Sequence, residues 1–511
     1  MSKSRLIVLL CLVFVVLFSA CQPTPTVPPM VNRGQGLSDE FIAPPLAEGE
    51  KREIDAPTHW EEAKSLRNGE IEVVADIDIE MPETVGNIRV LELAQREFAD
   101  EYLKTLTDYF AKGSRLYKIP KMTKSRLAQE LEDVKNRVGD YNSPYSQAIA
   151  YELSIPELIE QAPESTTKEY VSAGFDFPTK DETEMLRSRY RQEQDTIETR
   201  NTFSAYVEDD GIAPKITATK YDPKVGSNSS FAFKRGIIYP ASLLAADHEG
   251  YNSFLSWKGT ELEGGLNDAW LEEKASWLDM MDERMGSIII SPDRAQAQAD
   301  SVLADLGISD LGLFRAEPGI QILTEEYQMW TNTMNRMHKG ISSSLFKPGY
   351  LFVYYRKDGE LISLRYSNNA TLVAPSFPPE NVSIFVTEDG VQSFEWINMS
   401  TVKGIVAENT SILSFETVKN NFYDILVYTA QGGRLKYQLK NARLGLYNTV
   451  AFNYPYRVWL VPCWYFEYEY FSYTDAFGDE ISMGSSSEIF NALDGRYIES
   501  SEGYLQAFAL N

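Results

Sequence analysis

The stretch from residue 70 to 80 alternates between apolar and mostly acidic side chains, and this pattern constrains the fold strongly. One face carries Ile71, Val73, Ala75, Ile77 and Ile79, and the other carries Glu72, Asp76, Asp78 and Glu80. Successive side chains of a strand point to opposite faces, so the pattern predicts a strand buried on one side only. Such a strand needs a covering layer, and apolar residues at helical spacing over 98–110 predict one helix soon after it.

Two further helices have clear start signals, and each precedes a run of strands. Ser291 before Pro292 and Ser414 before Phe415 are typical N-caps. Asp389-Gly390 and Asp494-Gly495 are typical hairpin turns between the strands that follow. A helix followed by antiparallel strands, twice over, predicts an α+β protein built from related modules of a helix packed on an antiparallel sheet.

The chain divides, on this interpretation, into consecutive parts. We expect a signal peptide over 1–20, a proline-rich linker over 21–58, an N-terminal α+β domain over 59–165, a connecting and mostly β region over 166–286, an α+β module over 287–410, and a C-terminal α+β module over 411–511. Seven prolines lie within the linker. Proline-rich segments stay extended, so we expect this linker to be disordered and to span about 35 Å or more.

The N-terminus has the layout of a secretory signal. Lys3 and Arg5 precede an apolar run over 6–18, and Phe18-Ser19-Ala20-Cys21 follows. These four residues resemble the lipobox of bacterial lipoproteins. The resemblance implies removal of residues 1–20 and attachment of lipid, such as palmitate, to Cys21. A plain signal peptide or a membrane anchor is the alternative, but the run is shorter than the roughly 17–25 residues that span a bilayer.

Charge and cysteine content exclude several classes of function. The net charge is −26, and a body this acidic repels phosphate backbones, so nucleic acid is not an expected partner. With Cys11 in the signal and Cys21 lipidated, Cys463 stands alone, so no disulfide framework is expected. Cys463 lies in an apolar stretch, which favours a buried, inert thiol over a nucleophile.

No motif in the sequence indicates a reaction, a metal or a cofactor. The segment Asp247-His248-Glu249 lacks the spacing of a zinc protease, and we interpret it as a charged loop. His338 lies near Met329, Met334 and Met337, which could suit Cu(I), although packing is the simpler interpretation. His59 supports no hypothesis. We interpret Gly484-Ser485-Ser486-Ser487 as a turn rather than a nucleophile motif.

One strand carries aromatic residues at every second position. Trp464, Phe466, Tyr468 and Tyr470 share a face, and Tyr465, Glu467 and Glu469 share the other. The aromatic face is a candidate for stacking on a glycan or peptide ligand. Packing in the core of the sheet is the commoner role of such a face.

The C-terminal residues resemble a known module. The segment from Leu460 to Trp464 and the segment 490–498, Phe490-Asn491-Ala492-Leu493-Asp494-Gly495-Arg496-Tyr497-Ile498, resemble the closing strands of PepSY-like domains, as found in YycH/YycI regulatory and YpeB-type germination proteins. Over its length the chain resembles uncharacterised bacterial lipoproteins with a domain of unknown function (DUF 6034). The resemblance implies that the last two modules are PepSY-like and act without chemistry of their own.

These observations favour a non-catalytic interaction or regulatory module, held by lipid on Cys21 at the extracytoplasmic face of the cell membrane. Its expected partners are the membrane and an envelope protein. The alternative hypothesis is a surface protein that binds a glycan or a peptide, and a third hypothesis is an unrecognised hydrolase.

Overall fold

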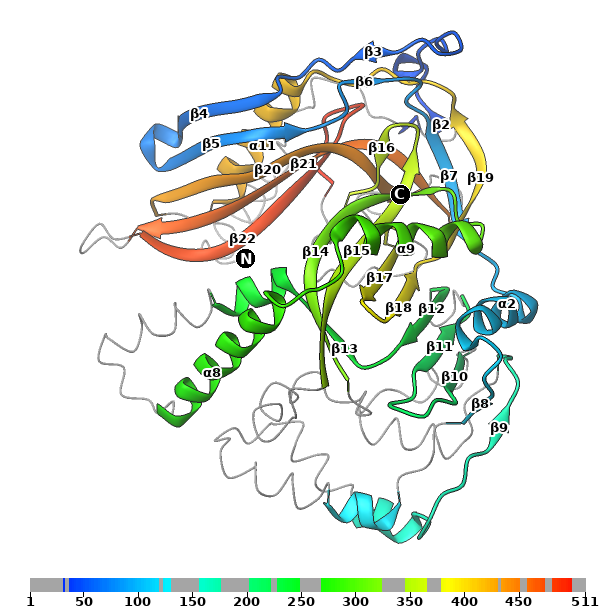
Figure 1. Ribbon diagram of the computed structural model, residues 1–511. Helices are drawn as coiled ribbons and strands as arrows, with labels where there is room; N and C mark the ends of the chain where they lie inside the picture. Colours follow the sequence, from blue (N-terminus) through cyan, green and yellow to red (C-terminus); the bar gives the residue numbers. More distant parts are fainter. Residues whose placement is uncertain are drawn as a thin grey trace, which may run out of the picture. The chain divides into compact units, whose positions relative to one another are not determined.

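The computed structural model describes residues 31–32, 36–118, 123–129, 156–175, 202–221, 228–248, 268–323, 345–364, 378–430, 433–450, 457–473 and 480–498. Cys21 and the signal peptide lie outside these residues, as do Glu249, Met329, Met334, Met337 and His338. The chain folds as two compact units (Figure 1). Unit 1 takes its described residues from 1–92, 358–371 and 403–511, and unit 2 takes them from 93–357 and 372–402.

The sheet of unit 1 is built mainly from two segments that are far apart in sequence. Its strands are β4 (His59–Leu66), β5 (Ile71–Glu80), β20 (Leu435–Val450), β21 (Arg457–Tyr473) and β22 (Glu480–Asn491). β5 pairs antiparallel with β4 and parallel with β20, and β21 pairs antiparallel with both β20 and β22. The sheet continues through β7 (Val90–Gln95) and β19 (Ser400–Ala407), and the division between the units falls within these two strands.

Helix α11 (Phe415–Thr429) covers one face of this sheet. It begins as predicted, because the Ser414 side chain accepts a hydrogen bond from the Thr417 amide. Its buried Phe422 stacks on Phe466 of β21, with ring centroids 4.7 Å apart. Trp60 of β4 packs edge-on against Phe466. Aromatic pairs in offset or edge-on contact stabilise a core beyond the area that they bury.

The opposite face of the same sheet has a second core, which N-terminal residues complete. Leu37 and Phe41 pack there with Trp459, Val461 and Cys463. Residues 36–58 are therefore part of unit 1, whereas the sequence suggested a linker as far as residue 58. The apolar residues of this segment are too widely spaced to show periodicity, so only the sheet that they cover reveals their role.

The sheet of unit 2 is antiparallel in every pair of the order β13–β14–β15–β17–β18–β12–β11–β10–β8–β9. The bounds are β8 (Leu116–Tyr117), β9 (Tyr170–Val171), β10 (Thr202–Val207), β11 (Lys215–Thr219), β12 (Ser230–Lys234), β13 (Ile237–Pro240), β14 (Leu311–Ile322), β15 (Phe346–Asp358), β17 (Asn381–Thr387) and β18 (Gly390–Ile397).

Helices α2 (Asp100–Ala111) and α9 (Pro292–Asp305) contribute to the core of unit 2. Phe110 of α2 stacks on Phe231 and Phe233, and Ala295, Ala299 and Val302 of α9 are buried as their helical spacing predicts. A smaller cluster forms around helix α8 (Asp268–Met285), where Trp277 and Met281 are buried. Trp277 and Met281 of this helix therefore pack in the protein interior.

The remaining described elements are short. They are β1 (Val31–Asn32), β2 (Gly36–Leu37), η1 (Asp39–Phe41), β3 (Arg52–Glu53), η2 (Arg67–Gly69), β6 (Thr84–Val85) and β16 (Leu361–Ile362). Helical turns also occur at 124–129, 156–161 and 241–248.

The predicted α+β class is confirmed, and so is the half-buried strand, with Ile71, Val73, Ala75 and Ile79 buried. The predicted hairpin at Gly390 also forms, with positive φ at this glycine. The division of the chain into units differs from the predicted consecutive domains. Residues 59–80 do not belong to a separate N-terminal domain, because β5 pairs with β20 more than 350 residues later.

Candidate functional site

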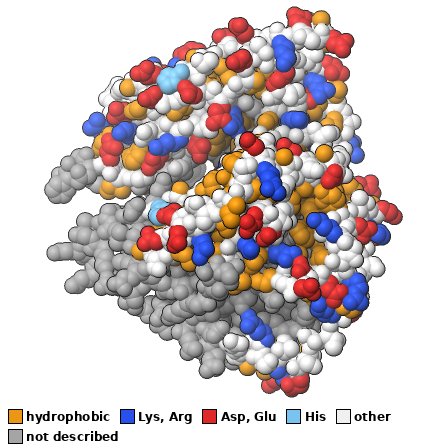
Figure 2. All heavy atoms as spheres, viewed as in Figure 1, with side chains coloured by type: hydrophobic (Ala, Val, Ile, Leu, Met, Phe, Trp, Pro, Cys, Tyr) orange, Lys and Arg blue, Asp and Glu red, His pale blue; other side chains and the backbone are white. Residues whose placement is uncertain are grey.

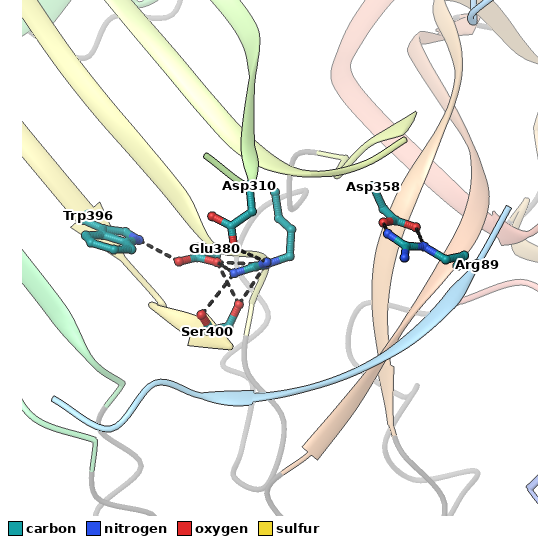
Figure 3. Close-up of polar contacts among 7 residues, drawn as sticks. Arg89, Asp310, Asp358, Glu380, Trp396 and Ser400 are labelled. Atoms are coloured by element: carbon teal, nitrogen blue, oxygen red, sulfur yellow. Dashed lines mark hydrogen bonds and ion pairs between the residues drawn. The ribbon is translucent and has the colours of Figure 1, made fainter. Parts of the chain in front are cut away.

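Arg356, at the end of β15 in unit 2, is a buried arginine, and Figure 3 labels its partners Asp310, Glu380 and Ser400. Its guanidinium binds the Glu380 carboxylate, and the distance from Nε to Oε2 is 2.9 Å. Its Nη1 donates to Asp310 Oδ2 at 2.7 Å, and its Nη2 donates to the Ser400 carbonyl at 3.1 Å. Burial lowers the pKa of Arg356, but the two carboxylates outweigh this effect and raise the pKa overall.

The Glu380 carboxylate accepts hydrogen bonds from three residues. Oε1 accepts from the Trp396 indole at 2.8 Å, and Oε2 accepts from the Ser400 hydroxyl at 2.8 Å as well as from Arg356. Each buried charge thus has an opposite charge and further hydrogen bonds, which is the condition for a stable buried pair. The cluster offers no open group to a ligand, so we assign it a structural role.

Arg89 and Asp358 form a similar pair within unit 1, with Nε 3.0 Å from Oδ2 (Figure 3). The Asp358 side chain raises the pKa of Arg89 through its hydrogen bond. The Nε and Nη2 atoms of Arg89 each donate to one oxygen of the Asp358 carboxylate. Such a bidentate contact is the stronger form of an arginine–carboxylate pair.

A third cluster joins α11 to β4. Glu62 accepts hydrogen bonds from Lys419 Nζ at 2.9 Å, from the Tyr423 hydroxyl at 2.9 Å and from the Trp60 indole at 3.1 Å. Burial raises the pKa of Glu62, but these donors outweigh it, so the pKa is lowered and the carboxylate stays charged. Lys419 also pairs with Glu416 at 2.8 Å. Because its charged groups are paired with one another, this cluster offers no unpaired charge to a ligand.

An open depression lies beside the start of α11 and is lined by residues 53–57 and 414–416. Glu53, Asp55 and Glu416 make it acidic, although a helix N-terminus favours anions. The Phe415 amide at this helix start already donates to the Asp55 carbonyl at 2.9 Å. The depression therefore has neither the charge nor the open amides of an anion site.

The first part of β22 is an exposed stretch of strand in unit 1. Residues 480–486 are exposed, and Ile481 and Met483 present apolar side chains to solvent. Among the described residues, β21 is the only strand that pairs with 480–488, so the other edge of this stretch has no described partner strand (Figure 1). Glu480 is its single charged residue before Glu488, and Lys436 neutralises it at 3.0 Å.

Exposed strand edges usually carry charges, prolines or bulges that prevent pairing with other chains. The β21–β22 ladder has a bulge between Tyr470 and Phe471. Beyond that bulge, Gly484, Ser485, Ser486 and Ser487 carry neither charge nor proline. The backbone of this stretch is therefore accessible to an extended polypeptide, and we take residues 480–487 as the candidate interaction edge.

The candidate interaction edge ends where β22 enters the core, at Glu488. The Glu488 carboxylate accepts a hydrogen bond from the Tyr468 hydroxyl at 2.7 Å, and the side chain is buried. Burial raises the pKa of Glu488, whereas hydrogen bonds from Tyr497 and Tyr468 oppose this rise. After a turn at Gly495, Tyr497 forms an antiparallel β-bridge with Phe490. The Ile498 amide donates a hydrogen bond to the Ile489 carbonyl at 2.7 Å.

The aromatic residues singled out from the sequence lie mostly in the core. Trp464, Phe466 and Tyr468 are buried beneath α11, and Tyr470 is half-buried at the end of the row. This placement agrees with packing rather than with a ligand-stacking surface for the first three. Tyr470 lies on β21 directly opposite Gly484 of the candidate interaction edge.

The remaining chemical candidates are placed simply. Cys463 is fully buried, and burial raises the pKa of its thiol well above the usual range. His59 is exposed on β4 and contacts Asp78 at 2.8 Å, which raises its pKa. His248 contacts Asp282 at 3.0 Å. Within the described ranges, no three His, Cys, Asp or Glu side chains gather as metal ligands would.

The sequence interpretation missed the candidate interaction edge, because it assigned 484–487 to a turn. That assignment was wrong, since these residues pair with Tyr470, Glu469, Tyr468 and Glu467 of β21. Both faces of this stretch are exposed, so no apolar alternation marks it. The available signal was the alternating strand that contains Trp464 and Tyr470, because residues 484–487 pair with it.

Comparison with known proteins gives no family. No family model matches the chain, and no curated protein matches it. A crystal structure of an uncharacterized protein from Eubacterium rectale is similar at 10% identity and a TM-score of 0.41, over 87% of this chain and 94% of that chain. In the part of the chain that is described, no helix has the length and apolar character needed to cross a bilayer.

Proposed function

We propose that this chain is a lipid-anchored protein of the extracytoplasmic face of the cell membrane, and that it acts as a non-catalytic interaction module in the cell envelope. Cys21 would carry the lipid, and the candidate interaction edge would contact a partner protein. The observation that carries the proposal is that, among the described residues, 480–487 of β22 pair only with β21 and present two exposed apolar side chains.

The chemistry of the described residues supports a role without catalysis. Arg356 is bound to Glu380, and in unit 1 Lys419 is bound to Glu62, while the thiol of Cys463 is buried. An edge strand instead offers backbone donors and acceptors, which is how β-strand addition binds extended segments. On the face drawn in Figure 2, acidic and basic side chains are interspersed, as on a solvated surface.

The PepSY-like character of the C-terminal modules and the likeness to DUF 6034 lipoproteins belong to the same proposal. They rest on the Val461-Pro462-Cys463-Trp464 strand and on the hairpin at Gly495. They agree with a modular envelope protein that regulates or binds another protein.

Site-specific crosslinking in native membranes tests this function. A photo-reactive residue is placed at Ile481 or Met483 on the edge, and at Tyr428 as a control, because Tyr428 is 80% exposed on α11. We expect one protein, identified by mass spectrometry, to crosslink from both edge positions and not from Tyr428. The same yield from all three positions, or no product from the edge, would contradict the proposal.

The anchor has its own test. Cys21→Ala should release the folded body from the membrane fraction and remove the edge-specific crosslink, because the partner is expected at the membrane. A Cys21→Ala chain that stays in the membrane fraction would assign the anchor to another segment.

A further inference from the structure

Residues 484–487 of the candidate interaction edge are small, and this makes the next strand, β21, reachable from outside. Gly484 has no side chain, and a Cβ built there meets nothing within 4 Å. Ser485 and Ser487 are also small and exposed or half-buried. Adjacent strands lie about 4.8 Å apart, so a strand added to β22 would lie about 9.6 Å from β21. Two long side chains can meet across that distance.

The two faces of β21 present different groups behind this row. On one face, Tyr470 lies opposite Gly484 and is half-buried. On the other face, Glu469 lies opposite Ser485 and Glu467 lies opposite Ser487. Glu469 already binds Lys440 at 3.1 Å and Ser482 at 3.0 Å. Burial lowers the pKa of Arg443 and the charge of Glu467 opposes this, so Glu467 lies near one cation, which itself pairs with Glu80. Glu467 therefore offers an incoming cation less competition than Glu469, which has two direct partners.

From this geometry, and resting on the proposed function, we infer that the edge takes an extended segment of a partner protein that carries a Lys or Arg opposite Ser487 and a bulky apolar or aromatic residue opposite Gly484. These two positions are three residues apart, so their side chains point to opposite faces of the added strand. The cation then faces Glu467, and the bulky group packs on Tyr470.

Charge also selects this partner over a second copy of the chain. The net charge of −26 makes two copies repel each other, whereas a basic segment is attracted. The strand itself is held by backbone hydrogen bonds, and the two side chains supply its specificity.

The test uses the purified full chain and short synthetic peptides made of Thr and Val, with Lys and Trp placed three positions apart. Fluorescence anisotropy compares this Lys–Trp peptide with a Glu–Trp and a Lys–Ala version. We expect the Lys–Trp peptide to bind most tightly. Glu467→Lys should weaken the Lys–Trp peptide and strengthen the Glu–Trp peptide, by roughly two- to fivefold each, which is the range for exposed ion pairs.

Glu48→Lys is the matched control, since Glu48 is exposed in the same unit and the variant has the same net charge. It should leave the preference between the two peptides unchanged. Hydrogen exchange should show new protection of amides within 481–487 when the Lys–Trp peptide is added. A charge preference that Glu467→Lys does not alter, or that Glu48→Lys alters equally, would overturn the inference.

Two other occupants give distinct results. Protection, in the monomeric chain without peptide, of the amides in this stretch that do not bond to β21 would show that the chain covers its own edge. Protection that grows with protein concentration would show pairing of two copies. Either result would overturn the inference. If the edge crosslinks to a membrane partner but no peptide binds, the partner chemistry is wrong while the proposed function stands.

Discussion

The Lys419 ammonium donates to the Glu62 carboxylate at 2.9 Å, and this bond fastens helix α11 to β4 at the edge of the unit 1 sheet. The Lys419 side chain is 11% exposed and the Glu62 side chain 26% exposed. A pair that is shielded in this way is screened by salt less than one in open solvent.

Lys419→Met should therefore lower the free energy of unfolding by about 1–3 kcal/mol, because Glu62 would lose its cation while remaining partly buried. Urea denaturation measures the change. The control is Lys104→Met, which removes an exposed pair with Asp108 on α2 and should cost at most about 0.5 kcal/mol. Equal losses of stability in the two variants would show that the Lys419–Glu62 pair contributes no more than an exposed ion pair.

The two carboxylates that bind Arg356 should differ sharply in their contribution to stability. The Glu380 side chain is 1% exposed, whereas that of Asp310 is 43% exposed. Glu380→Ala leaves the buried guanidinium without its inner partner and should cost about 3–5 kcal/mol. Asp310→Ala should cost less than about 1 kcal/mol, since water replaces that carboxylate. Denaturant titration of both variants tests the order, and a larger loss for Asp310→Ala would contradict it.

Glu488 should make stability depend on pH. Burial raises the pKa of Glu488 above its unfolded value, so the folded state holds the proton more tightly. The stabilising contribution is then complete below the unfolded pKa, near 4.5, and is lost as pH rises through the folded pKa. Glu488→Gln should remove this loss, so the variant should melt at a higher temperature than the native chain at pH 7.

The control for this pH effect is Glu480→Gln. A hydrogen bond from Lys436 lowers the pKa of Glu480, so its contribution has the opposite sign and is lost as pH falls. Melting curves of the three chains from pH 4 to pH 8 give the comparison. A Glu488→Gln chain that is less stable than the native chain at pH 7 would show that the ionised carboxylate is needed.

Cys463 should be chemically inert in the folded protein. Burial raises the pKa of its thiol, and only the thiolate reacts rapidly with alkylating agents. Iodoacetamide should therefore leave the Cys463 peptide unmodified under native conditions and modify it fully in urea, as mass spectrometry of the digest reports. Rapid native modification would require opening of the sheet around β21.

Local patterns in the sequence were sufficient for the elements that have one buried face. The apolar positions of 71–79, the Ser291 and Ser414 caps and the Gly390 hairpin each depend on neighbours within a few residues. The general α+β class follows from such elements. The buried, unreactive environment of Cys463 was also predictable, because its flanking residues are apolar.

Long-range pairing was decided only in the tertiary structure. The parallel contact of β5 with β20, and the use of Leu37 and Phe41 to cover Trp459, join residues hundreds of positions apart. No local periodicity records which strand a given edge will meet, because backbone hydrogen bonds pair strands without regard to side-chain identity. For the same reason, the Gly-Ser-Ser-Ser stretch resembled a turn and proved to be the exposed edge of a sheet. What the sequence by itself determined is therefore the set of half-buried elements, and the fold decided which backbone edge was left accessible.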